Sequence, residues 1–305
     1  MQTYDVIVLG AGGVGSAALY ELARRGVRAV GIDRFHPPHD RGSSHGQTRV
    51  IRQAYFEHPD YVPLLKKSYQ LWRELEAATG RQLFHEVGVL EVGPADGDVV
   101  PGVLRAAAEH RLDVDQIAAP EIERRWPGLR VPGGLVGVFE RNAGYLLVEE
   151  CVAAQLEAAA AAGAKLLVDT VVHDWTADEH GVVVRTSAGA LTAQRLIVSA
   201  GSWTAPLWTG RLSDQSEEDS LFPNLDVRRK SLFWFETDSP RYDVARGVRA
   251  GSVARAREGA GTSAGSHCRP RRAPMNPTSR PVAHHVRQSH HVAALLTALC
   301  LFVVG

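Results

Sequence analysis

The chain has 305 residues, 45% hydrophobic and 22% charged, which is ordinary for a soluble globular protein with one large domain or two. Its 34 basic and 34 acidic residues cancel, which argues against a nucleic-acid partner or an acidic membrane surface. The three cysteines, Cys151, Cys268 and Cys300, are scattered without a CxxC spacing, so neither a disulfide framework nor a metal site is expected. The chain starts with a strand-like run rather than a signal peptide, and the cytoplasm is the expected location.

The most informative stretch is YDVIVLGAGGVGSAALYELARRGVRAVGIDRF, residues 4–35. Its apolar run predicts a strand buried on both faces of a parallel sheet, and Gly10, Gly12 and Gly15 follow it as GxGxxG. The first glycine allows a tight turn, the second lets the backbone approach a pyrophosphate, and the third lets the next helix pack against the strand. That helix would offer its free N–H groups to the phosphates.

A second predicted strand, RAVGID, ends at Asp33, where a carboxylate can accept hydrogen bonds from a ribose hydroxyl. Strand, glycines, helix, strand and terminal acid in this order predict a dinucleotide site, with a glycine-rich structural turn as the alternative. The acid would repel the 2′-phosphate of NADP. It leaves NAD and FAD both open.

Residues 42–55, GSSHGQTRVIRQAY, have neither a helical nor a strand period and bring His45, Arg49 and Arg52 close together in the chain. From the residues alone, a solvated loop and a binding site explain the two arginines equally well. A guanidinium suits bidentate pairing with a carboxylate. A cation near a flavin would stabilise negative charge on the reduced ring.

The rest of the chain alternates helical and strand patterns. A helix is predicted over 61–80, with an apolar stripe and a terminal glycine, and a strand over 85–93. Helical segments are predicted at 96–113 and 120–128. Residues 147–203 predict helix, strand, hairpin and strand, ending in RLIVSAGSW, a buried strand whose glycine turn would approach the nucleotide again. The predicted stripe consists of Leu64, Leu65, Tyr69, Leu71, Trp72 and Leu75.

The cysteine and histidines of this folded part are assigned structural roles. Cys151 lies on a predicted helix and is expected to be a small buried hydrophobe. The histidines have no ligand spacing, and we expect no metal site among His58, His85, His110, His173 and His180.

The composition changes near residue 244. Residues 244–305 contain nine arginines, five histidines, no lysine and a single acidic residue, Glu258. With a single aromatic residue, Phe302, and no sustained period, the segment is expected to be a low-complexity, disordered tail. Its apolar end, 292–305, is shorter than the roughly 20 residues that span a membrane, and a membrane anchor is the less favoured alternative.

These motifs, with PPHDRGSSHGQTRVIRQAYFEHPDYVPL, GVLEVGP, RWPGL, FERNAGYL and LIVSAGSW, resemble the monomeric sarcosine oxidase and N-methyltryptophan oxidase group of D-amino-acid-oxidase-like flavoproteins. The resemblance covers residues 3–243. It implies an α/β fold in which a Rossmann-like, GR2-type FAD-binding domain is interleaved with an antiparallel-sheet substrate domain, both within 1–243. It also implies FAD as cofactor and oxidation of the C–N bond of a secondary (N-methyl) amino acid such as sarcosine. Molecular oxygen would be the acceptor, giving hydrogen peroxide, and the protein would be a monomer without nucleic-acid or membrane partners.

The resemblance also assigns roles to single residues. Arg52 would pair with the substrate carboxylate, Arg49 would assist the flavin, and His45 would lie beside it, as the catalytic residues. The cofactor-binding positions would be Gly10, Gly12, Gly13, Val14, Gly15, Asp33, Ser43, Ser44, Arg49 and Val172.

The later motifs of the family do not follow. We find no matching flavin-linking cysteine, no lysine after Lys230 and no GxxGHGxK segment, and neither Cys268 nor Cys300 lies in a matching context. We therefore expect non-covalent FAD. We hypothesise that the chain is truncated or frameshifted after about residue 243. A catalytically inactive FAD-binding fragment and an NAD-dependent dehydrogenase are the alternative functions.

Overall fold

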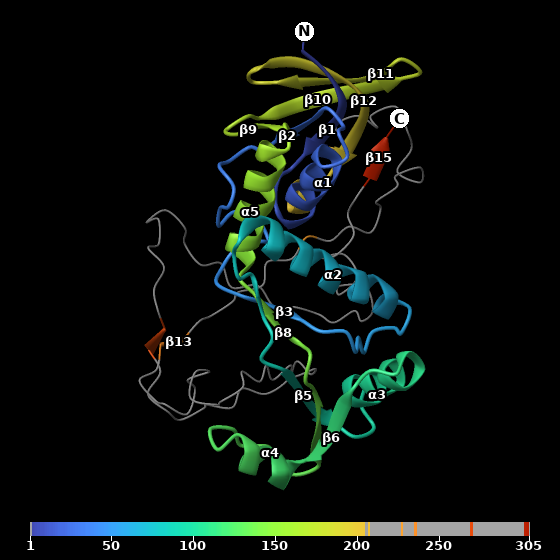
Figure 1. Cartoon of the computed structure of the whole chain (residues 1–305), viewed down its shortest axis with the longest axis vertical. Helices are drawn as coiled ribbons and strands as arrows, with labels where there is room; N and C mark the ends of the chain where they lie inside the picture. Colours follow the sequence, from blue (N-terminus) through green and yellow to red (C-terminus); the bar gives the residue numbers. More distant parts are fainter. Residues whose placement is uncertain are drawn as a thin grey trace. The chain divides into compact units, whose positions relative to one another are not determined.

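The computed structural model of this chain describes residues 2–204, Leu207, Val227 and three short strands, β13 (Phe235–Glu236), β14 (Arg269–Pro270) and β15 (Phe302–Val304). The chain divides into two compact units (Figure 1). Unit 1 comprises Met1–Gln47, Val148–Lys230 and Arg280–Gly305, and unit 2 comprises Thr48–Leu147 and Ser231–Ser279. Apart from β14 and β15, the expected tail 244–305 lies outside the described residues, as do Cys268, Cys300 and the apolar end of the chain.

Unit 1 is built on one mixed sheet, with strands in the order β10-β11-β12-β1-β2-β9 and β15 added against β12. Its central strand β1 (Gln2–Leu9) pairs in parallel with β12 (Gly189–Val198) and β2 (Ala29–Ile32), and β2 pairs with β9 (Lys165–Leu167). The strands β10 (Val172–Asp178) and β11 (Gly181–Thr186) continue the sheet as an antiparallel hairpin. The sequence prediction of a strand buried on both faces is confirmed, since Ile7 and Val8 are fully buried.

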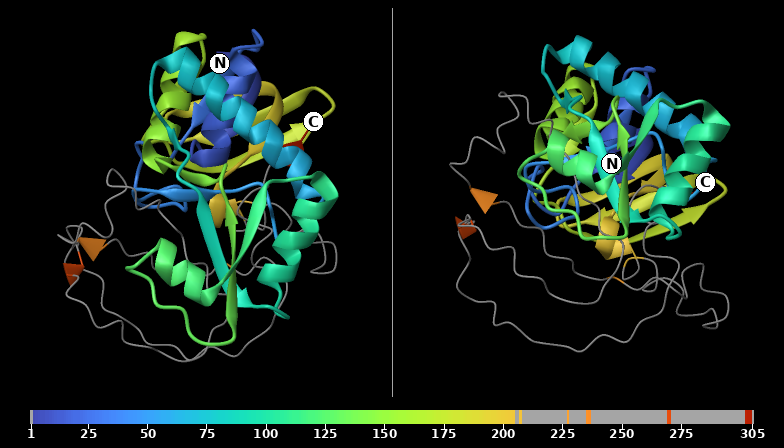
Figure 2. Two further views of the ribbon diagram at one scale, coloured as in Figure 1. Left: turned by 60° about the horizontal axis from the view of Figure 1, so that its bottom comes forward. Right: turned by 90° about the horizontal axis from the view of Figure 1, so that it is seen from below.

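Alternate residues of β1 serve two separate cores. Val6 and Val8 pack with Leu19 of α1 (Gly13–Ala23) and Val152 of α5 (Val148–Ala161). Ile7 and Leu9 pack on the opposite face of the sheet, with side chains of the β10-β11 hairpin. Figure 2 shows α1 and α5 on the same side of the sheet. The glycine turn between β1 and α1 therefore lies at the end of the central strand, where α/β sheets bind ligands.

The described residues of unit 2 form the two-stranded sheet β13-β14 and two larger antiparallel sheets. One has the order β3-β8-β4, formed by β3 (Arg49–Ile51), β8 (Gly144–Leu146) and β4 (Phe84–His85). The other has the order β5-β7-β6, formed by β5 (Val89–Pro94), β7 (Leu135–Glu140) and β6 (Val114–Ala118). The helices in the described part of this unit are α2 (Tyr61–Thr79), α3 (Val99–His110) and α4 (Ala119–Arg125). Together with unit 1, these elements confirm the expected α/β class.

One local sequence prediction in unit 2 is wrong, and a second fails at a single residue. The single strand predicted over 85–93 is two strands in different sheets, because Gly88 turns the backbone at φ +79° beside the ring of Phe139. In the predicted apolar stripe of α2, Leu75 is buried and Trp72 half-buried, whereas Leu64 is 59% exposed. A stripe through Val62, Leu65, Tyr69 and Leu75 keeps helical spacing, and Leu64 falls outside it.

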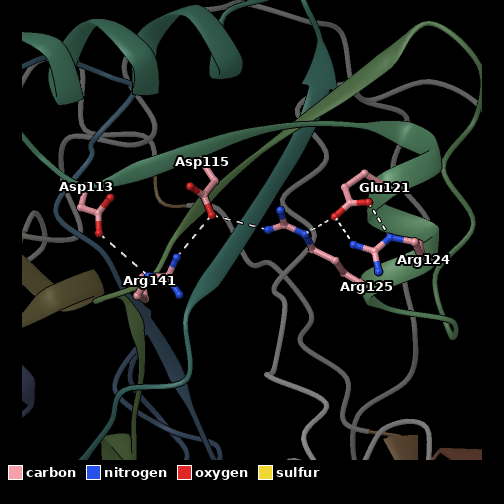
Figure 3. Close-up of polar contacts among 6 residues, drawn as sticks. All are labelled: Asp113, Asp115, Glu121, Arg124, Arg125 and Arg141. Atoms are coloured by element: carbon pink, nitrogen blue, oxygen red, sulfur yellow. Dashed lines mark hydrogen bonds and ion pairs between the residues drawn. The ribbon is translucent and has the colours of Figure 1, made fainter.

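An ion-pair network lies on the surface of unit 2 (Figure 3). Arg125 of α4 contacts Glu121 at 2.6 Å and Asp115 of β6 at 3.5 Å, and Arg141 contacts Asp115 at 3.5 Å. Hydrogen bonds from Arg124 and Arg125 lower the pKa of Glu121 to about 2. Because these groups are exposed and their charges balance, water and salt screen them, and the network fastens α4 to β6 only weakly.

None of the helices in the described part of the chain is long and apolar enough to cross a membrane. The expected cytoplasmic location stays a prediction.

The packing at Gly15 generates the first prediction. In an exposed helix, Gly→Ala normally adds up to about 1 kcal/mol of stability. Here the added Cβ would overlap the carbonyl oxygen of Gly10 and lie 2.7 Å from Ser199 Oγ. Gly15→Ala is therefore expected to lower the free energy of unfolding by about 1–3 kcal/mol, as overpacking does, in denaturant titrations. Gly133→Ala, where a Cβ would meet nothing within 4 Å, is the control and should leave the midpoint unchanged. Equal behaviour of the two variants would contradict the close packing.

Candidate functional site

The turn between β1 and α1 is closed on one side and open on the other. Gly10 has φ +90°, and a Cβ there would lie 2.5 Å from the carbonyl oxygen of Ser199, at the end of β12. The Ser199 hydroxyl lies 2.8 Å from the Gly10 carbonyl oxygen, so the end of β12 approaches the turn as the sequence predicts. Gly12 is the N-cap of α1 and brings no capping side chain, and a Cβ on it would meet only Ser44 Oγ, at 3.8 Å. This N-terminus, whose N-cap residue has no side chain, fits the phosphates of a dinucleotide.

Asp33 joins the end of β2 to the same turn. Its carboxylate is buried and accepts hydrogen bonds from the backbone N–H of Ala11 at 2.8 Å and of Phe35 at 2.9 Å. His39 Nε2 lies 3.3 Å from the same carboxylate. Each carboxylate oxygen has two lone-pair sites, so acceptor capacity remains for a ribose hydroxyl. His39 was missed in the sequence because its contact with Asp33 depends on the path of the intervening loop.

The loop 42–47 is anchored within unit 1 at two helix N-termini. Ser44 Oγ accepts a hydrogen bond from the Gly13 N–H at 3.0 Å, and the Gly46 N–H donates to Glu149 Oε1, in the first turn of α5, at 2.7 Å. His45 Nδ1 hydrogen-bonds the Gly42 carbonyl oxygen within the loop. Ser44 is thus placed beside the first turn of α1, next to Gly12.

The remaining predicted cofactor residues of unit 1 differ in position. Val14 lies half-buried in the first turn of α1, whereas Ser43 is exposed in the loop. Val172 begins β10, two residues after Thr170, whose N–H donates to the Asp33 carbonyl oxygen at 2.9 Å. The structure therefore brings together the glycine turn, Asp33, Ser44 and the segment that leads into β10. That these residues bind a dinucleotide stays a prediction.

Arg49 and Arg52 belong to unit 2, whereas His45 belongs to unit 1. Arg49 begins β3 opposite Leu146 of β8, and its Nη1 donates to the Thr48 carbonyl oxygen at 2.8 Å. Arg52 follows β3 directly and its side chain is only 15% exposed. Arg52 is therefore not a solvated loop residue, which removes that alternative for it.

The guanidinium of Arg52 is held on its edges and on its face. Nη2 lies 3.1 Å from Glu57 Oε2, and Nε lies 3.2 Å from Glu91 Oε1. The rings of Tyr55 and Phe56 lie 4.4 Å and 5.2 Å from Cζ, in cation–π contact. The Nη edge faces the less buried carboxylate, Glu57, and the Nε edge faces the more buried one, Glu91.

Glu140 fixes the backbone that carries these groups. Its carboxylate, at the end of β7, accepts hydrogen bonds from the Gln53 N–H at 2.8 Å and the Ala54 N–H at 2.9 Å. Gly102 of α3 lies against the backbone of Phe56, where a Cβ would overlap. The segment from Arg52 to Glu57 is thus held between β7 and α3.

Burial dominates the electrostatics of this cluster. It raises the pKa of Glu91 to about 7, with Arg52 opposing the shift and Glu140 and Glu57 adding to it. Burial also raises the pKa of Glu140, against the effect of its two amide donors, and the pKa of the Tyr55 phenol. One cation therefore faces three carboxyl groups in a poorly solvated place.

Comparison with known proteins identifies the family of this chain. A family profile described as FAD dependent oxidoreductase matches residues 5–294. The chain belongs to this family. FAD is therefore the cofactor that the glycine turn of unit 1 fits, in place of the NAD that the sequence left open.

Among curated relatives, a monomeric sarcosine oxidase from Arthrobacter sp. (strain TE1826) is 43% identical over 82% of this chain and 62% of its own length. An N-methyl-L-tryptophan oxidase from Salmonella arizonae is 37% identical over 79% of the chain and 61% of its own length. The chain thus spans about three-fifths of the length of these relatives.

Among solved structures, NikD, an unusual amino acid oxidase of nikkomycin biosynthesis, has a TM-score of 0.64 at 29% identity, covering 69% of this chain and 54% of that one. Glycine oxidase from Geobacillus kaustophilus, with a TM-score of 0.59 at 24% identity over 68% of this chain and 58% of that one, shares the fold. Both are oxidases of this flavoprotein fold, so the structural and sequence comparisons agree.

Three acidic residues near Arg52 were missed by sequence reasoning: Glu57, Glu91 and Glu140. The signal that could have found two of them is an ionisable residue next to apolar strand residues, in GVLEVGP and in VGVFERNAG. Their joint position behind Arg52 depends on strand register and is not readable from either motif.

The predicted structural roles of Cys151 and the histidines agree with their surroundings. Cys151 is 3% exposed on α5, which confirms the prediction of a buried hydrophobe. His85 stacks on Tyr145 at 4.9 Å, and His58 and His180 are exposed. Within the described residues, no three His, Cys, Asp or Glu side chains form a group that could hold a metal ion.

The raised pKa of Glu91 generates a prediction about stability. An acid with a folded-state pKa near 7 and an unfolded-state value near 4.5 binds more protons when folded, so stability falls as pH rises between these values. The loss is at most about 3 kcal/mol. Glu91→Gln removes the ionisation and is expected to gain stability relative to the wild type between pH 5 and pH 8, in denaturant titrations at both values. For Glu109→Gln, on the exposed side of α3, the difference from the wild type should not change with pH. If the stability difference between Glu91→Gln and the wild type is the same at pH 5 and pH 8, the pKa of Glu91 is not raised.

Proposed function

We propose that this protein carries out FAD-dependent oxidation of the C–N bond of a secondary amino acid, an N-methyl amino acid such as sarcosine. Molecular oxygen is the acceptor and hydrogen peroxide the product. The observation that carries the proposal is the 43% identity to a monomeric sarcosine oxidase over 82% of the chain. The N-methyl-L-tryptophan oxidase relative supports the same substrate class, because sarcosine is itself an N-methyl amino acid.

The residues of unit 1 hold the cofactor. The N-terminus of α1 at Gly12 would take the pyrophosphate, with Gly10, Gly13, Val14 and Gly15 forming the turn around it. Asp33 would accept hydrogen bonds from the ribose, and the backbone of Val172 would contact the nucleotide. Ser43, Ser44 and His45 would hold the flavin from unit 1, and the flavin-assisting role of Arg49, a residue of unit 2, stays a prediction. Bound FAD supplies the two-electron acceptor for the oxidation of the C–N bond.

Arg52 holds the substrate by its carboxylate. Its Nη edge faces Glu57, a half-buried carboxylate of the same chain, so this edge is already shaped for an anionic oxygen pair. A ligand carboxylate takes the place of Glu57, while Tyr55 and Phe56 keep the guanidinium plane fixed. Arg52 contributes to the rate by orienting the bound substrate through its carboxylate.

A second candidate function is a catalytically inactive FAD-binding fragment. The observation that favours it is the length of the match, about three-fifths of the curated relatives. An NAD-dependent dehydrogenase is disfavoured by membership of the FAD-dependent family. Non-covalent FAD, a monomeric state and the cytoplasmic location remain predictions.

The absorbance spectrum of the purified chain tests cofactor binding. We expect a flavin spectrum, with the flavin released into the supernatant on acid precipitation because no cysteine is predicted to link it. Peroxide formation with sarcosine then separates the oxidase from the inactive fragment. Flavin in the pellet would contradict the non-covalent link, and absence of flavin would contradict FAD binding by this chain.

The role of Arg52 generates a separate prediction. Arg52→Gln removes the positive charge and the paired N–H donors of the guanidinium group. It is expected to lower kcat/KM for sarcosine by about 10- to 100-fold or more, mainly by raising KM. Arg130→Gln is the control, because Arg130 is exposed and donates only to the carbonyls of Pro127 and Leu129. Flavin content should be the same in both variants. An unchanged KM in Arg52→Gln would rule out the carboxylate role.

A further inference from the structure

The charges around Arg52 do not balance. One guanidinium faces three carboxyl groups, Glu57, Glu91 and Glu140, all from unit 2. Glu91 and Glu140 are 3% and 4% exposed, so water does little to screen them. A substrate carboxylate arriving at Arg52 would bring a fourth negative group to a single cation. Such a site binds an anion well only if one of its own carboxyl groups becomes neutral.

The three carboxyl groups are held differently. Glu140 accepts two backbone N–H bonds, which favour its ionised form. Glu57 accepts hydrogen bonds from Arg52 Nη2 and retains some contact with water. Glu91 Oε1 lies 3.2 Å from Arg52 Nε, yet among the described residues neither atom makes a hydrogen bond. Glu91 is therefore the carboxylate that loses least by taking up a proton.

The surroundings of Glu91 offer it no other compensation. Glu91 lies on β5 opposite Val138 of β7, and Val138 packs in an apolar cluster with Val99, Val100 and Val103 of α3. The buried residues of α3 are all apolar or glycine. In the described part of unit 2, the titratable and charged groups that act on Glu91, or on which Glu91 acts, are Arg52, Glu57, Glu140 and the phenol of Tyr55.

We propose that Glu91 takes up a proton when a carboxylate binds to Arg52, so that the affinity of this site for carboxylates depends on pH. The inference rests on the proposed role of Arg52 as the carboxylate-binding residue, and it assigns Glu91 as a positioning residue that acts through Arg52. The proton comes from solvent and resides on the Glu91 carboxyl. When Glu91 is neutral, the positive charge of Arg52 interacts only with the ligand carboxylate and with the carboxylates of the cluster that stay ionised.

The pH range follows from the groups already described. Burial raises the pKa of free Glu91 to about 7, and a bound anion raises it further. Below about pH 6 Glu91 is already neutral, and ligand binding takes up no proton. Above about pH 7 the free site must first gain a proton, so affinity weakens by up to about tenfold per pH unit.

Titration calorimetry of the FAD-loaded full chain with acetate tests this linkage. Acetate stays ionised from pH 6 to pH 8, so it adds no proton change of its own. Runs in two buffers with different heats of ionisation give the number of protons taken up. We expect a value near zero at pH 6 that rises toward one at pH 8, with a dissociation constant about tenfold weaker at pH 8 than at pH 6.

Two variants isolate the group. Glu91→Gln should bind acetate with no proton uptake and with the same dissociation constant at both pH values. Glu109→Gln, with an exposed carboxyl on α3, should behave as the wild type. A ¹³C NMR titration of glutamate carboxyl groups provides a measurement without ligand. The resonance that is missing in Glu91→Gln should titrate near pH 7, and a midpoint near 4.5 would overturn the inference.

The outcomes separate this inference from the proposed function. Acetate binding without proton uptake, or uptake that persists in Glu91→Gln, overturns the role of Glu91 and leaves that of Arg52 intact. Proton-linked acetate binding without peroxide from sarcosine supports the role of Glu91 and overturns the oxidase activity. No acetate binding by the wild type overturns the carboxylate site and the inference together.

Discussion

The close approach of three backbone segments at the glycine turn is the constraint on which unit 1 depends. At Gly10 and Gly15 a Cβ would collide with Ser199 and with the Gly10 carbonyl oxygen, so β1, α1 and β12 meet only because both side chains are absent. The same turn places the Ala11 N–H on the carboxylate of Asp33. Close packing and the proposed phosphate site therefore depend on the same glycine-rich backbone, since the N-terminus of a helix can offer N–H groups to phosphates.

Unit 2 is governed by the desolvation of charge rather than by backbone packing. Its two charged clusters show the difference. The exposed network pairs three carboxylates with three guanidinium groups, so its effect on stability is small (Figure 3). Around Arg52 the groups are buried and acidic in sum, so each protonation changes the interaction energy of all the others. Only the second kind of cluster can transmit the binding of an anion.

The sequence predicted the parts of the fold that local physics determines. Local physics favours a tight turn at the glycines, a buried strand at β1 and a strand end at Asp33. The structure contains all three. Strand 85–93 failed because its alternation continues through Gly88, where contact with Phe139 of another strand decides the turn. Glu91 and Glu140 were missed for a similar reason. They share one face of a sheet only through the register that pairs Val89 with Glu140 and Glu91 with Val138.

That register also places Glu91 opposite an apolar residue, Val138, where its charge is poorly solvated. A buried carboxylate without a hydrogen bond is unfavourable, and an apolar side chain at this position would fill the space beside Val138 at lower cost. The apolar replacement would leave Arg52 between Glu57 and Glu140 with a fixed charge. In the proposed carboxylate site, Glu91 would make the charge that a ligand meets at the Nη edge change with pH near neutrality, because burial raises the pKa of Glu91 to about 7. The unfavourable group is what makes the site adjustable.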